Sequence, residues 1–181
     1  MIVEERMRTY INSLDMGNTS FLEELERKAL LDRVPIIRKE MQSFLKMFLA
    51  ATRPQTILEV GTAVGFSTLL MCEYGPADLK ITTIENYEKR IPIARENFRK
   101  AGRESQITLL EGDAGEILKT LTGTFDMITS NPPYIPTKVI EELEAEVRLH
   151  DPYEALDGKE DGLYFYRILA EKVPEYLTDG G

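Results

Sequence analysis

The chain has 181 residues, of which 43% are hydrophobic and 29% charged, a composition that supports one folded core and excludes a disordered or collagen-like protein. Its formal net charge of -9 disfavours strong non-specific attraction to a nucleic acid backbone, and no apolar run approaches the length of a membrane span. One cysteine and one histidine exclude an internal disulfide and a histidine-rich metal site.

Residues 1–52 are predicted to form a helical cap. The opening stretch MIVEERMRTY alternates charged and apolar residues instead of forming a signal-peptide core, which favours a cytoplasmic protein. Apolar residues at helical spacing predict helices over 3–14, 20–33 and 35–51, the second with Asn18, Thr19 or Ser20 as its N-cap. The third helix is expected to turn four apolar side chains inward: Phe44, Leu45, Phe48 and Leu49.

From residue 53 onward, strand patterns alternate with helical ones. Strand-forming runs lie at 56–60, 81–85, 107–114 and 125–130, separated by helical patterns at 66–74, at 87–101 and in a short stretch ending near 121. This alternation predicts an α/β fold, a Rossmann-like doubly wound parallel sheet with helices on both faces. Residues 53–181 and the cap are expected to form one structural unit. The basic residues between 89 and 103 are interpreted as a solvated helix face.

A glycine-containing turn follows the first predicted strand, in the stretch EVGTAVGFS. Gly61 and Gly65 allow close approach of the backbone to a ligand, although a purely structural role for both is equally open. The stretch does not match G-x-G-x-x-G, because Ala63 stands at the second glycine position, and this disfavours pyrophosphate binding.

Acidic residues follow the next two strands. Glu85 ends the second strand, where an acidic side chain meets a ribose hydroxyl pair in doubly wound nucleotide folds, and an exposed strand-end glutamate is the alternative. Asp113 follows the third strand and either accepts a hydrogen bond from an exocyclic amine or caps the next helix. Since carboxyl ends of parallel strands share one edge, the three features together favour an adenosine ligand.

The stretches ILEVGTAVGFSTL, ITTIE and LLEGDA resemble the three cofactor motifs of class I S-adenosylmethionine-dependent methyltransferases. Residues 1 to about 128 resemble more narrowly the bacterial O-methyltransferases of the catechol and caffeoyl-coenzyme A type, which include tRNA 5-hydroxyuridine methyltransferases. The resemblance places Glu59, Gly61 and Gly65 on the methionine part, Glu85 on the ribose, and Asp113 with Ala114 beside the adenine. The full predicted cofactor set is Glu59, Gly61, Thr62, Ala63, Gly65, Phe66, Glu85, Asp113, Ala114 and Asn131.

Residues from about 126 to 181 resemble a second family, the release factor glutamine methyltransferases. The resemblance rests on NPPYIP, LEAEV, DPYEAL, EDGL and LTDGG, with Asp151-Pro152 where that family has Glu-Pro. The O-methyltransferases would instead carry an aspartate-rich, metal-holding segment after the fourth strand, and this chain has Ser130 and Asn131 there. We therefore predict no metal, and the chain reads as a chimera joined within the fourth strand.

The tetrapeptide Asn131-Pro132-Pro133-Tyr134 suits methylation of a planar nitrogen. The Asn131 side-chain oxygen and the Pro132 carbonyl can each accept an N–H, and Tyr134 can pack on a planar amide and exclude water. Asn-Pro-Pro is also a common turn signal, and the motif is shared by enzymes that methylate adenine, cytosine and glutamine.

These observations predict a methyltransferase that uses S-adenosylmethionine and acts on a release factor glutamine. The alternatives are an O-methyltransferase acting on tRNA hydroxyuridine or a catechol-like hydroxyl, and an inactive cofactor-binding or interaction module. Glu146, Asp151 and Asp161 are candidate pocket residues, although acidic stretches of this kind are more often solvated. Four residues at helical spacing are expected in the core: Tyr164, Phe165, Leu169 and Val173.

The end of the chain gives a last expectation. In class I methyltransferases, by resemblance, a fifth strand begins just after a Gly-Gly turn, and this chain stops at Gly180-Gly181. The fourth strand would then lie at a sheet edge with unpaired backbone groups. We therefore expect a poorly stable chain that either self-associates through this edge or is a truncated piece of a longer protein.

Overall fold

The computed structural model describes residues 5–13, 16–143, 153–179 and 181. The strands are β1 (Thr56–Val60), β2 (Lys80–Glu85), β3 (Ile107–Glu111) and β4 (Met127–Ser130). The helices are α1 (Glu5–Ser13), α2 (Ser20–Leu31), α3 (Lys39–Thr52), α4 (Phe66–Tyr74), α5 (Ile91–Lys100), α6 (Ala114–Thr120), α7 (Thr137–Ile140), α9 (Tyr153–Leu156) and α10 (Tyr164–Tyr176). No helix in these described ranges is both long and apolar enough to cross a membrane.

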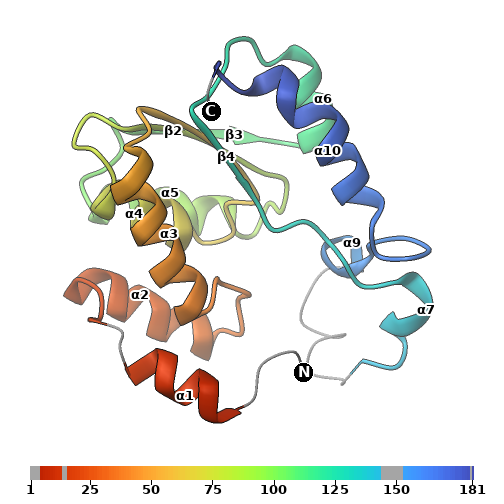
Figure 1. The fold of residues 1–181 in the computed structure, drawn as a ribbon, viewed down its shortest axis with the longest axis horizontal. Coiled ribbons are helices and arrows are strands. Elements are labelled where there is room, and N and C mark those ends of the chain that lie inside the picture. Colours follow the sequence, from red (N-terminus) through yellow and green to blue (C-terminus); the bar gives the residue numbers. More distant parts are fainter. Residues whose placement is uncertain (1–4, 14–15, 144–152, 180) are drawn as a thin grey trace.

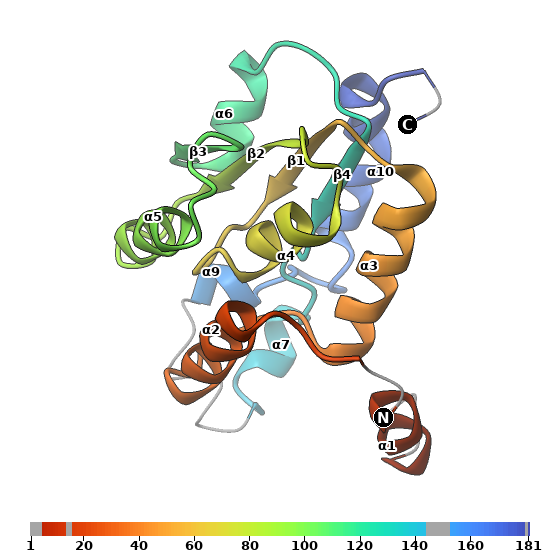
Figure 2. The ribbon, with the colours of Figure 1, turned by 90° about the vertical axis from the view of Figure 1, so that its left-hand side faces the viewer.

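The four strands form one parallel sheet with helices around it (Figure 1), and their order is β3-β2-β1-β4 (Figure 2). Register pairs Val60 with both Ile84 and Ser130, so the carboxyl ends of β1, β2 and β4 are level. Within the described strands β4 is at the edge, as predicted. Leu177 nevertheless forms a parallel bridge with Phe125, just before β4, so the chain returns beside this strand after α10.

Helices cover both faces of the sheet, which confirms the doubly wound architecture (Figure 2). Because strand side chains alternate between faces, Ile57, Ile81 and Met127 pack with Leu49 of α3 and Met71 of α4 on one face. On the other face, Leu58, Ile84 and Phe125 form a cluster against apolar residues of α6 and α10, namely Ala114, Ile117, Leu118 and Tyr176.

The cap shares a core with the helices of the sheet. Leu22 and Leu25 of α2 belong to the same buried cluster as Phe66 and Leu69 of α4 and Phe98 of α5. The cap helix α2 therefore covers α4 and α5, and its apolar face is buried only when those helices are in place.

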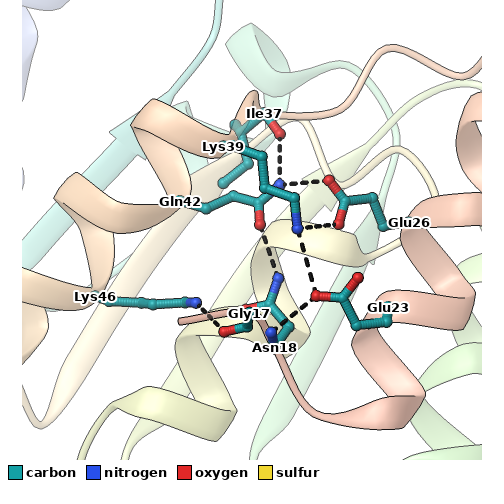
Figure 3. A network of polar contacts seen from close by, with 8 residues as sticks. All are labelled: Gly17, Asn18, Glu23, Glu26, Ile37, Lys39, Gln42 and Lys46. Atoms are coloured by element: carbon teal, nitrogen blue, oxygen red, sulfur yellow. Dashed lines mark hydrogen bonds and ion pairs between the residues drawn. The ribbon is translucent and has the colours of Figure 1, made fainter. Parts of the chain in front are cut away.

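A polar network joins α2 to α3 inside the cap (Figure 3). Its centre is Gln42, fully buried in α3, whose Nε2 donates to Glu26 Oε1 at 2.9 Å and to the Ile37 carbonyl at 3.1 Å. The Gln42 Oε1 accepts from Asn18 Nδ2 at 2.8 Å, and Lys39 Nζ lies 2.7 Å from Glu26 Oε2. Since a buried amide is costly unless its donors and acceptor are satisfied, this network fixes how α2 and α3 meet.

The third helix departs from the prediction at its start and in its inward face. It begins at Lys39 instead of residue 35, because residues 34–38 are not helical and pack Val34, Ile36 and Ile37 on the core. The prediction that Phe44 and Phe48 face inward is wrong, since their side chains are 52% and 38% exposed. The inward face is formed by Gln42, Leu45 and Leu49. Because Gln42 is polar, the spacing of apolar residues alone does not reveal this face.

The C-terminal helix also differs from its prediction. Tyr164 is exposed, and Phe165, Leu169 and Val173 are only half-buried, so none of the four predicted core residues is a core residue. The reason is that α10 lies alongside the edge of the sheet and packs through one side (Figure 1).

Of the candidate pocket residues, Glu146 and Asp151 lie outside the described residues, and Asp161 accepts hydrogen bonds from the Leu163 N–H and the Arg167 guanidinium.

Within the basic run between 89 and 103, Arg95, Arg99 and Lys100 form an exposed, ion-paired face of α5, in agreement with the interpretation of the run. Arg95 pairs with Glu111, and Arg99 and Lys100 both lie close to Glu96. These glutamates offset the positive charge that a phosphate backbone would need.

Candidate functional site

Predicted site residues lie at the carboxyl ends of the three neighbouring strands β2, β1 and β4. Val60, Ile84 and Ser130 form one row across β1, β2 and β4, and the residues directly after them are Gly61, Glu85 and Asn131. The N–H groups of Gly61 and Thr62 both donate to the Ile84 carbonyl, at 3.0 and 3.2 Å. The glycine turn, the β2 carboxylate and the start of the Asn-Pro-Pro-Tyr turn are thus brought together.

The two glycines of the turn serve different ends. Gly61 has φ +104°, and a Cβ built on it would meet no atom within 4 Å, so this position is open to a ligand. Gly65 has φ +81°, but a Cβ there would lie 2.9 Å from Cζ of Phe98 and closer still to its Cε1. Gly65 is therefore required for the packing of α5 on the turn. Its predicted place on the cofactor stays a prediction.

Glu85 is buried, 8% exposed, and its carboxylate joins two loops. Its Oε2 accepts the Ala63 N–H of the glycine turn at 2.6 Å, while Oε1 accepts the N–H groups of Asn86 and Tyr87 at 3.1 and 2.9 Å. Ala63 has φ 49°, a left-handed conformation that this hydrogen bond helps to hold. Because each carboxylate oxygen can accept more than one hydrogen bond, Glu85 can also take a hydroxyl donor.

Glu59 is buried in β1 among hydroxyl groups. Its carboxylate accepts from Ser67 Oγ at 2.6 Å, Thr68 Oγ1 at 2.5 Å and Thr83 Oγ1 at 2.7 Å. Burial raises the pKa of Glu59, and the three hydroxyl donors oppose that rise. Since Thr83 gives its only proton to Glu59, Thr62 must donate to Thr83, 2.6 Å away. Glu59 therefore links β1, β2, α4 and the glycine turn.

The third strand ends at a helix cap. Asp113 is the N-cap of α6, and its Oδ1 accepts the Glu116 N–H at 3.0 Å, which confirms the capping role considered for it. Ala114, the first residue of this helix, is half-buried. Placing Asp113 and Ala114 beside an adenine remains a prediction, and the capped Asp113 still offers its second carboxylate oxygen.

The Asn131-Pro132-Pro133-Tyr134 turn lies at the surface of this edge. Asn131 and Tyr134 are exposed, while both prolines are half-buried. The Ser130 hydroxyl donates to the Val60 carbonyl at 3.4 Å, which joins the end of β4 to the end of β1. The polar atoms of Asn131 are thus accessible to an acceptor molecule beside the glycine turn.

Three hydroxyl residues of the site escaped the sequence prediction. Ser67, Thr68 and Thr83 support Glu59, and two of them stand in the first turn of α4 while the third lies in β2. Their only signal is the run of small polar residues directly after Gly65-Phe66. The contribution of Thr83 depends on strand register, which no local pattern encodes.

Comparison with known families decides the class of this fold. The family model described as O-methyltransferase matches residues 12–131, which include β1 to β4 and the glycine turn. The chain belongs to this family. Strand register brings the ends of β1, β2 and β4 level in this family member, and the roles of the residues there stay predictions.

Curated relatives connect the same chain to a second group of methyltransferases. Release factor glutamine methyltransferases of Caulobacter vibrioides and Geobacter sulfurreducens are 40% and 37% identical to it over 126 and 131 residues. These matches cover 70% and 72% of this chain, and the chain spans only 43% and 44% of the relatives' own length. Because the matches are longer than residues 126–181, the likeness includes part of the cofactor half.

A solved structure supports the fold over almost the whole chain. The methyltransferase PaMTH1 of Podospora anserina, crystallised with bound S-adenosylhomocysteine, is 26% identical to it. The match has a TM-score of 0.69 and covers 97% of this chain and 65% of that protein. The α/β class and the Rossmann-like sheet predicted from the sequence are thereby confirmed.

Proposed function

We propose that this O-methyltransferase family member binds S-adenosylmethionine and methylates the side-chain amide nitrogen of a glutamine in a peptide chain release factor. The observation that carries the proposal is the position of Asn131. It directly follows Ser130, which is level in the sheet with the residues before Gly61 and Glu85. The turn that suits methylation of a planar nitrogen therefore begins beside the glycine turn that we assign to the cofactor. The release factor enzymes of Caulobacter and Geobacter support the choice of acceptor.

The residues at the sheet edge fit the cofactor. The open space at Gly61 admits a ligand close to the backbone, and the Glu85 carboxylate is placed at a strand end, where it can accept ribose hydroxyls. The bound cofactor supplies a methyl group on a positively charged sulfur, and the sulfur–methyl bond breaks as the nitrogen–methyl bond forms and the amide releases one proton to water. We assign Asp113 and Ala114 to the adenine, and the methionine part to Glu59, Gly61 and Gly65.

The Asn131-Pro132-Pro133-Tyr134 turn would orient the acceptor. An amide nitrogen is a poor nucleophile because its lone pair is delocalised, so its orientation contributes strongly to the rate. The Asn131 side-chain oxygen and the Pro132 carbonyl accept the two N–H groups of the glutamine, and Tyr134 covers the amide plane.

A second candidate is transfer to oxygen, on a tRNA hydroxyuridine or a small catechol-like hydroxyl. The match of residues 12–131 to the O-methyltransferase family favours it. Against it, residues 130–134 after β4 contain no carboxylate that could help to hold a divalent metal. An inactive cofactor-binding module is the third outcome.

Although Asn131 is also in the predicted cofactor set, we assign its side chain to the acceptor. We therefore predict that Asn131→Ala abolishes methylation of the release factor and leaves cofactor affinity nearly unchanged. Transfer of tritiated methyl groups to release factor, to bulk tRNA and to catechol measures the activity, and calorimetry measures cofactor binding. Ser105→Ala is the control, since Ser105 is exposed and lies just before the amino end of β3, away from the carboxyl ends of the strands.

Chelation separates the two candidate activities. Activity on the release factor should be indifferent to EDTA. Activity on tRNA or catechol that is lost with EDTA and restored by magnesium would establish the oxygen acceptor instead. Cofactor binding without transfer to any of the three acceptors would leave the binding module as the answer.

A further inference from the structure

The turn that carries the acceptor motif is held by a second segment far along the chain. Backbone hydrogen bonds run from Ile135 N–H to the Leu156 carbonyl at 3.2 Å, from Gly158 N–H to the Ile135 carbonyl at 2.8 Å, and from Thr137 N–H to the Lys159 carbonyl at 2.9 Å. Ile135 and Asp157 form a parallel bridge. We call residues 134–137 and 156–162 together the clasp.

Two glycines allow the clasp to close. A Cβ on Gly158 would lie 2.8 Å from both Cα and the carbonyl carbon of Tyr134. A Cβ on Gly162, which has φ +77°, would overlap the carbonyl oxygen of Tyr134 and lie 3.2 Å from its carbonyl carbon. Both contacts are to backbone, which cannot move aside as a flexible side chain can. A residue with a Cβ at position 158 or 162 would therefore push the backbone of Tyr134 away.

Side chains lock the same contact. Asp157 is buried, and its Oδ1 accepts the Thr137 hydroxyl at 2.6 Å and the Lys159 N–H at 3.0 Å. Its Oδ2 accepts from Lys159 Nζ at 2.9 Å. Hydrogen bonds from Lys159 and then from Thr137 lower the pKa of Asp157, so the carboxylate stays ionised at neutral pH. The Asp157 carboxylate thus connects Thr137, three residues after Tyr134, to the segment 156–162.

We propose that residues 156–162 are the positioning element of the acceptor site, with Thr137, Asp157, Gly158 and Gly162 as positioning residues for the Asn131-Pro132-Pro133-Tyr134 turn. This rests on the proposed function, in which that turn binds the acceptor amide. Tyr134 is both the last residue of the motif and the residue whose backbone contacts the two glycines. The hydrogen bonds that define the clasp run between residues 135–137 and 156–159, so we expect it to act on the acceptor through the turn.

Two pairs of variants test the proposal. Gly162→Ala introduces the overlap with Tyr134, whereas Gly102→Ala is the matched control, because Gly102 has φ +64° and open space around its Cβ position. Thr137→Val removes the hydroxyl donor, and Thr137→Ser restores it. We expect Gly162→Ala and Thr137→Val to lower kcat on release factor roughly 10- to 100-fold with cofactor affinity unchanged. Gly102→Ala and Thr137→Ser should stay near wild type.

Hydrogen exchange read by mass spectrometry gives a readout that does not need activity. In Gly162→Ala and Thr137→Val, the amides of residues 134–137 and 156–162 should exchange faster, while those of β1 should not change. Equal exchange in all four variants would refute the clasp. A wild-type chain that methylates no release factor would refute the proposed function, and the exchange result would still decide the clasp. If exchange rises but kcat does not fall, the segment has no positioning role.

Discussion

A single carboxylate can have a structural and a binding role at once, and Glu85 is placed for both. It holds the Ala63 N–H of the glycine turn and two N–H groups of its own loop, so it shapes the turn beside which a ligand would lie. A change at Glu85 must therefore be judged by binding and by stability together.

We predict that Glu85→Ala weakens binding of S-adenosylmethionine by roughly 1.5–3 kcal/mol, because hydrogen bonds from the ribose to a charged group are lost. Calorimetry measures the affinity, and a thermal melt reports the cost of freeing the Ala63 N–H. Glu88→Ala serves as a control, since Glu88 is an exposed residue in the same loop. Equal affinities for wild type and Glu85→Ala would remove the ribose assignment.

At the residue scale, the sequence predicted which candidate residues stand at strand ends, but not the contacts that support them. The positions of Gly61, Glu85 and Asn131 follow from strand ends, which local patterns reveal. The support of Glu59 by Thr83 does not follow, because it depends on which strand is its neighbour and in which register. The clasp joins residues about twenty positions apart through glycine backbone contacts, for which a sequence pattern has no signal.

At the scale of elements, periodicity predicted all four strands and most of the helices. It failed at residues 34–38, where a helix was expected to begin at residue 35 but Val34, Ile36 and Ile37 pack on the core from a non-helical backbone. It also failed for Phe44, because the buried face of α3 contains Gln42. Tertiary contacts override local preference in both cases.

The pairing of β1 with β4 depends on one carboxylate at their amino ends. Asp126 Oδ2 accepts the N–H groups of Gln55 and Thr56 at 2.8 and 2.9 Å, and the Thr56 hydroxyl at 3.1 Å. These hydrogen bonds, that from Gln55 first, lower the pKa of Asp126 below its ordinary 3.8. Because the native pKa is depressed, the stabilisation is complete above the unfolded pKa and is lost as the pH falls through the native pKa.

We therefore predict that Asp126→Asn lowers the free energy of unfolding by about 1–2 kcal/mol at pH 7, and that this difference shrinks as the pH falls below 4. Urea unfolding at pH 7, 4 and 3 measures it. The control is Glu104→Gln, an exposed acidic residue that should change stability little at any pH. A difference that is the same at all three values would show that the charge of Asp126 is irrelevant to the pairing.

At the scale of the molecule, we propose that the cap, residues 1–52, and the sheet domain, residues 53–181, fold as one unit. The buried cluster that contains Leu22 of α2 also contains Val64 of the glycine turn, Phe66 of α4 and Phe98 of α5. Apolar residues from three helices and the glycine turn are therefore buried together, and the described residues of the cap show no buried cluster of their own. Loss of a cap side chain should be felt in the sheet and in the cofactor turn.

The test compares two leucines of α2. Leu22 is 2% exposed and Leu30 is 61% exposed, so Leu22→Ala should cost roughly 2–5 kcal/mol of unfolding free energy and Leu30→Ala less than about 0.5. Denaturant unfolding followed by far-ultraviolet circular dichroism and by tyrosine fluorescence should show one coincident transition in each variant, shifted only in Leu22→Ala. Two separate transitions, or a Leu22→Ala chain in which the sheet unfolds at its wild-type midpoint, would show that the cap is an independent unit. A single transition that shifts in Leu22→Ala would mean that the buried face of α2 and the glycine turn unfold together, as one cooperative core.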